Sequence, residues 1–73
     1  MTRSGVILFH TTSSAMRTEK VLAKEGLSVK FVPTPREFSS DCGIALRFDW
    51  NQVDYVRALL EVAHIETDSI HPL

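Results

Sequence analysis

The order of the hydrophobic patterns constrains the fold of this chain more than any other feature of its sequence. A continuous apolar run at residues 5–10 and an alternating run at residues 27–32 indicate two strands. Between them, residues 13–26 have helical spacing and end at Gly26, a residue typical of helix C-termini. Residues 44–48 alternate again, so this part of the chain has the order strand, helix, strand, strand.

The rest of the chain completes a known folding pattern. Residues 53–63 carry apolar side chains at helical spacing, Asp49 is placed to cap this helix, and Gln52 is its capping-box partner. The tail favours a short last strand around Ile65–Ile70. This order is that of a ferredoxin-like α+β fold, a βαββαβ two-layer sandwich. We therefore predict one domain over residues 1–73, with two helices on one face of an antiparallel sheet in the spatial order 4-1-3-2.

The small size of the chain makes the second face of this sheet important. A chain of 73 residues buries a limited share of its surface and is marginally stable alone. Its one cysteine excludes an internal disulfide and a zinc site built only from cysteines. No residues are left over to cover the second face, which favours a homodimer through that face or an edge strand.

Charge and hydropathy bear on the partners that we expect. The apolar run near the N-terminus is too short for a signal peptide or a membrane span, so we expect a cytoplasmic protein with a reduced thiol. The net charge of −1 gives no general attraction to nucleic acid. Residues 1–36 hold six basic and two acidic groups and residues 37–73 hold two and seven, which two oppositely charged faces would explain. We predict neither nucleic acid nor a membrane as a partner.

The stretch FVPTPREFSSDCGIALRF, residues 31–48, contains an elaborated loop between two strands. Thr34 and Glu37 form a capping box, and the proline between them suits the first position of a helix. This spacing predicts one helical turn across about Pro35–Ser39.

The loop ends in polar turn formers and the only cysteine. Ser39, Ser40 and Asp41 are typical of turns, and the serines lack the sequence context of a nucleophile. Gly43 permits a close backbone approach or a positive φ. We therefore predict an ordered loop that holds Cys42 in a fixed place.

The predicted topology brings Cys42 to the start of the first helix, where Thr12 or Ser13 is placed to be the N-cap. Helix N-terminal N–H groups and a nearby cation favour a thiolate, and Arg36 lies in the same loop. His10 lies at the same end and is an acid–base candidate. We hypothesise that Cys42 is a partly exposed, activated thiol.

Other polar side chains have ordinary structural explanations beside functional ones. Arg47 points to the face opposite the helices, where it can cover the sheet, pair across the strand or contact a second copy. Cys42, His10 and His64 map to one end of the fold, but three ligands from distant segments are a weak metal signal. We predict no metal and no other cofactor.

The segment HTTSSAMRTEKVLAKEGLSVKFVPTPREFSSDCGIALRF resembles the selenium/sulfur-carrier-like family of small proteins, long described as a domain of unknown function. That family shows Pro-Thr-Pro-Arg-Glu, Ser-Ser-Ser-Cys-Gly and Ala-Leu-Arg-Phe motifs, and the likeness is good over roughly residues 5–48. Cys42 occupies the position of the family cysteine. The resemblance implies that this sulfur holds a persulfide or selenium group.

Asp41 departs from the family pattern, which usually has serine there. A carboxylate beside Cys42 would oppose its ionisation unless Arg36 or Arg47 neutralises the charge.

The resemblance implies a carrier rather than an enzyme. It would receive the chalcogen from a donor such as a cysteine desulfurase and pass it to an acceptor protein. The alternative is a small dimeric ligand-binding or regulatory module with an anion pocket at residues 33–43, where Arg36 and backbone N–H groups are ligands. A thiol oxidoreductase is disfavoured because the chain has no resolving cysteine.

Overall fold

The structure, a computed structural model, describes residues 3–38 and 42–73. Their elements follow the predicted order, with one short 3₁₀ turn, η1, before the second helix. The elements are β1 (Ser4–Leu8), α1 (Thr12–Lys24), β2 (Val29–Pro33), β3 (Ile44–Asp49), η1 (Trp50–Gln52), α2 (Val53–Val62) and β4 (Ser69–Pro72).

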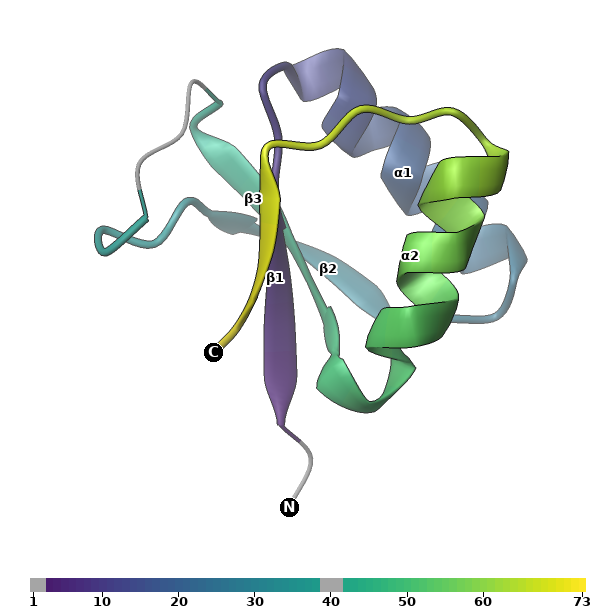
Figure 1. Cartoon of the computed structure of the whole chain (residues 1–73). Helices are drawn as coiled ribbons and strands as arrows, with labels where there is room; N and C mark the ends of the chain where they lie inside the picture. The colour runs from purple at the N-terminus through teal and green to yellow at the C-terminus, as the bar shows by residue number, and fades with distance from the viewer. Residues whose placement is uncertain (1–2, 39–41) are drawn as a thin grey trace.

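The four strands form one sheet in the order β2-β3-β1-β4, and all three neighbouring pairs are antiparallel. Both helices lie on one face of this sheet (Figure 1). The ferredoxin-like α+β fold is therefore confirmed, as is the spatial order 4-1-3-2.

The main core lies between the helices and the sheet. In the register of the strands, Ile7 on central β1 faces Leu46 on β3 and Ile70 on β4, so all three point to the helical side. The helices contribute residues at helical spacing. The buried residues of this core are Ile7, Phe9, Ala15, Leu22, Cys42, Leu46, Phe48, Val56, Leu60 and Ile65.

The opposite face of the sheet is also apolar near its centre. Val6, Leu8 and Ala45 are almost completely buried, although no helix covers them. Val32 and Phe38 pack against them, and Phe38 comes from the loop between β2 and β3. The expectation that no residues remain to cover this face is therefore wrong, because part of the loop folds back over it.

The first helix begins one residue earlier than expected. Thr11, not Thr12 or Ser13, is the N-cap, and its side-chain oxygen accepts a hydrogen bond from the Ser14 N–H at 3.2 Å. Thr11 has the extended backbone that N-caps require, whereas residues from Thr12 onward are already helical.

Both helices end in a Schellman motif. After α1, the N–H of Leu27 donates to the carbonyl of Leu22, and Gly26 has φ +80°, as its predicted role requires. After α2, the N–H of Ile65 donates to Leu60 in the same way, with His64 at φ +55°. No other described non-glycine residue has a positive φ.

Two boundaries in the second half differ from the sequence prediction. Asp49 caps η1 through the Asn51 N–H at 3.0 Å, and Gln52 makes no side-chain cap bond. The last strand is Ser69–Pro72 rather than Ile65–Ile70. The reason is that Ile65 closes the end of α2 instead: its N–H donates to the carbonyl of Leu60, and its side chain is buried in the main core.

Gly5 is a point of close approach on β1. A Cβ atom there would lie 2.5 Å from Cε3 of Trp50 and 2.8 Å from Cζ of Phe48. The missing side chain lets the two aromatic rings, whose centroids lie 6.0 Å apart, pack directly on the central strand. No helix in the described part of the chain is long and apolar enough to cross a membrane.

Candidate functional site

Cys42 lies where the loop returns to the sheet, two residues before β3 begins. Its Sγ atom is 3.7 Å from Oγ1 of Thr12, the first residue of α1. The predicted proximity of the cysteine to the start of the first helix is thus confirmed. A thiolate at this place would face a hydroxyl and the positive end of a helix.

Cys42 is buried, with 5% of its surface exposed. The expectation of a partly exposed thiol is wrong, and the alternation of β3 explains why. Cys42 has the same parity as Ile44 and Leu46, so its side chain continues the row that faces the helices. The sulfur therefore belongs to the main core as well as to the start of α1.

Thr34 holds the base of the loop. Its hydroxyl donates to the carbonyl oxygen of Cys42 at 2.8 Å, and its N–H donates to the carbonyl of Gly43 at 3.1 Å. These two bonds fix the backbone on which the cysteine sits. The predicted capping box is wrong, because the Thr34 hydroxyl is used across the loop instead.

The loop contains one turn, in about the predicted place. The N–H of Phe38 donates to the carbonyl of Pro35 at 3.0 Å, which closes a single turn over residues 35–38. Arg36 lies in this turn and is exposed. Ser39, Ser40 and Asp41 lie outside the described residues.

The other predicted site residues do not gather around the sulfur. Arg47 lies opposite Val6 on the face of the sheet that points away from the helices, so it is separated from Cys42 by the sheet. Gly43 has no described atom within 4 Å of an added Cβ, and its φ is not left-handed. The positive φ expected of Gly43 is therefore wrong.

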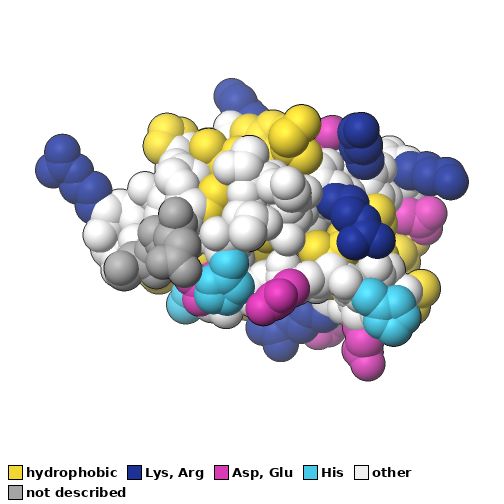
Figure 2. All heavy atoms as spheres, turned by 90° about the horizontal axis from the view of Figure 1, so that it is seen from above, with side chains coloured by type: hydrophobic (Ala, Val, Ile, Leu, Met, Phe, Trp, Pro, Cys, Tyr) yellow, Lys and Arg dark blue, Asp and Glu magenta, His cyan; other side chains and the backbone are white. Residues whose placement is uncertain are grey.

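His10 follows β1 and is exposed at the same end of the sheet as the start of α1. Figure 2, which looks onto this end, shows histidine side chains at two separate places on the surface. Within residues 3–38 and 42–73, no three His, Cys, Asp or Glu side chains form a group that could hold a metal ion.

Two residues near the loop were not singled out from the sequence. Phe38 stacks on His71 of β4, with ring centroids 4.2 Å apart and planes at 12°. Nε2 of His71 is also 2.8 Å from Oγ of Ser69. The signal for Phe38 was present, since it is the one large apolar side chain in a polar loop. His71 had no such signal, because the predicted last strand, Ile65–Ile70, ends before it.

Comparison with known proteins gives one clear match. Searches of curated proteins and of solved structures find no significant relative. The model of the family described as "Putative Se/S carrier protein-like" matches residues 4–72, and the chain belongs to this family.

Proposed function

We propose that this protein carries sulfur or selenium on Cys42 and relays it from a donor enzyme to an acceptor protein. The donor is of the cysteine desulfurase type. The protein acts stoichiometrically, holding one chalcogen atom per chain, and does not turn over a substrate by itself.

The observation that carries the proposal is the position of the Cys42 sulfur at the first turn of α1. Its Sγ lies 3.7 Å from the Thr12 hydroxyl. The carbonyl of the same residue is held by Thr34. A hydroxyl that can donate and a helix N-terminus both stabilise negative charge on sulfur. The thiolate is the form that accepts a sulfane sulfur.

The transfer step is a thiol exchange at sulfur. The Cys42 thiolate attacks the terminal sulfur of a donor persulfide, R–S–SH. The donor S–S bond breaks, its electron pair leaves with the donor as R–S⁻, and a new S–S bond forms to give Cys42–S–SH. Delivery repeats the same exchange on an acceptor thiolate, so no outside oxidant or reductant is needed.

The burial of Cys42 adds a condition to this chemistry. A side chain that is 5% exposed cannot meet a donor sulfur without a local shift of its surroundings. We expect the shift to accompany docking of the donor. In the free protein, the main core to which Cys42 belongs then shields the bound chalcogen from other thiols.

The test is sulfur loading followed by intact mass measurement. The protein is incubated with a cysteine desulfurase and cysteine, and in parallel with a selenocysteine-cleaving enzyme and selenocysteine. We expect a gain of one chalcogen atom in the wild type and none in Cys42→Ser. Because the chain has one cysteine, this variant removes every thiol.

A second step separates a carrier from a protein that is merely modified. The loaded protein is freed of donor and mixed with a thiol acceptor protein, and the loss of the added mass is followed. The proposal fails if folded wild type gains no chalcogen, or if the gained atom is never released to a thiol.

A further inference from the structure

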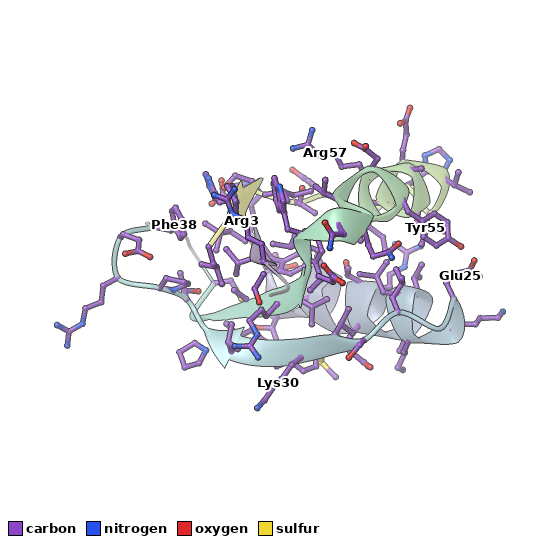
Figure 3. The ribbon with its side chains drawn as sticks, turned by 90° about the horizontal axis from the view of Figure 1, so that it is seen from below. Arg3, Glu25, Lys30, Phe38, Tyr55 and Arg57 are labelled. Atoms are coloured by element: carbon purple, nitrogen blue, oxygen red, sulfur yellow. The ribbon has the colours of Figure 1, made fainter. Side chains whose placement is uncertain are left out.

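A cavity lies at the end of the sheet away from Cys42. It has a volume of about 320 Å³ and opens to solvent where β1 begins, β3 ends and β2 begins. Figure 3 looks at the molecule from this end. The cavity is lined by Ser4, Ser28, Val29, Lys30, Arg47, Phe48 and Asp49.

Two cations of this cavity are direct neighbours. Lys30 on β2 is the register partner of Arg47 on β3, so both side chains leave the same face of the sheet. Like charges directly opposite one another on neighbouring strands are destabilising. The pair therefore costs the free protein stability unless an anion offsets it.

No carboxylate within residues 3–38 and 42–73 supplies that anion. Among the described residues, neither Lys30 nor Arg47 forms an ion pair with a carboxylate. Asp49 is the acidic residue in the lining, and its Oδ1 accepts the Asn51 N–H at 3.0 Å as the cap of η1. The Asp49 carboxylate therefore already accepts a hydrogen bond from the backbone.

The polar groups that line the cavity include several hydrogen-bond donors. Arg47 supplies a planar guanidinium, Lys30 an ammonium on a flexible stem, and Ser4 and Ser28 supply hydroxyls. In Figure 3, Lys30 extends outward from β2 into solvent. The stem of a lysine side chain is flexible, so its ammonium can reach different positions. Such a set suits the oxygens of a phosphate or carboxylate group.

We propose that this cavity binds the oxyanion group of a small molecule, with Arg47 and Lys30 as its charged ligands. The volume is at the lower end of the range for small-molecule sites. It is enough for a phosphate or carboxylate and a few attached atoms. The site is separate from Cys42 and does not depend on the carrier function.

The test is a titration with inorganic phosphate, followed by amide NMR shifts at constant ionic strength, with acetate in a parallel arm. We expect saturable shifts that centre on Ser4, Ser28, Lys30 and Arg47. Arg47→Gln removes one charge-assisted hydrogen bond to the anion, so we expect this variant to bind it at least about tenfold more weakly. Whichever anion saturates at the lower concentration identifies the oxyanion class.

The matched control is Lys20→Gln, which removes an exposed cation from the middle of α1 and leaves the cavity intact. It should bind as the wild type does. Without added anion, Arg47→Gln should unfold at the same or a higher temperature than the wild type, since the like-charge contact is gone. The proposal is overturned if the shifts do not saturate, or if Arg47→Gln and Lys20→Gln behave alike.

Discussion

The ring of Phe38 lies flat against the imidazole of His71, with 4.2 Å between their centroids. This contact joins the loop that carries Cys42 to the last strand of the sheet. It also completes the cover over Val6 and Leu8, which no helix reaches. The loop is thus held at two places, at its base by Thr34 and at its turn by this stack.

Phe38→Ala should loosen the loop and destabilise the protein. Removing a half-buried ring that packs on apolar residues is expected to cost about 1–2 kcal/mol of the free energy of unfolding. Urea unfolding followed by fluorescence of Trp50, the only tryptophan, measures this. Native-state alkylation of Cys42 should become faster in the same variant.

Phe31→Ala is the matched control, because this ring is 40% exposed on β2, outside the loop. It should leave the alkylation rate unchanged once the rates are corrected for global unfolding. A double-mutant cycle with His71→Ala should give a coupling of about 0.5–1.5 kcal/mol. Additive effects would show that the stack contributes nothing beyond burial.

The sequence predicted the fold because its periodicities are local and agree with one another. The alternation of Ile44, Leu46 and Phe48 correctly marks the face toward the helices, and Gly26 correctly marks the end of α1. Continuing the same alternation back to Cys42 would have predicted its burial. The prediction of exposure rested on the position of Cys42 in a loop. Its side chain is buried because it is in phase with Ile44 and Leu46, which face the helices.

The sequence could not predict contacts that depend on how the loop folds back. Thr34 fits a capping box by spacing, yet its hydroxyl bonds to Cys42 eight residues later. Neither the stack of Phe38 on His71 nor the cavity between Lys30 and Arg47 has a local signature. These contacts depend on the path of the loop and on which residues meet across the strands, and the spacing within one segment does not specify either.

Thr12→Val should slow alkylation of Cys42 at neutral pH. The variant keeps the shape of the side chain but removes the hydroxyl that lies 3.7 Å from Sγ and can donate to a thiolate. Thr12→Ser keeps the hydroxyl and should react nearly as the wild type does. Rates are measured with a small alkylating reagent, with the unfolded protein as reference. Equal rates for Thr12→Val and Thr12→Ser would exclude a role for the hydroxyl.

The hydrogen bond between Tyr55 and Glu25 makes a contribution to the free energy of unfolding that depends on pH. The Tyr55 hydroxyl donates to Oε1 of Glu25 at 2.6 Å, linking the start of α2 to the end of α1, and the two side chains point toward each other in Figure 3. This hydrogen bond, with smaller effects of desolvation and of the Glu25 charge, raises the Tyr55 pKa above 10.0. The protonated phenol is therefore the form that the fold favours.

The sign of the pH effect follows from the raised pKa. The contribution is fully present below the ordinary tyrosine pKa and is lost as the pH rises through the folded-state value. Because the chain has one tyrosine, its absorbance change gives this midpoint directly. Glu25→Gln should lower the midpoint, whereas Glu61→Gln, an exposed change on α2, should not. A midpoint unchanged by Glu25→Gln would show that the bond does not persist in solution.

His64→Gly should stabilise the protein. His64 ends α2 at φ +55°, a conformation that costs a residue with a Cβ about 1–2 kcal/mol and costs glycine little. Glycine also makes the unfolded chain more flexible, which offsets part of the gain. We expect a net gain of about 0.5–1 kcal/mol, measured by urea unfolding.

Two variants make this result interpretable. Glu66→Gly places the same residue at a nearby exposed position without a positive φ and should destabilise the protein slightly. Gly26→Ala puts a Cβ at φ +80° after α1, where no other atom would meet it, so its cost of about 1 kcal/mol reports backbone strain alone. If His64→Gly weakens the protein as Glu66→Gly does, His64 is not strained in solution. That result would mean that α2 ends there in a different backbone conformation.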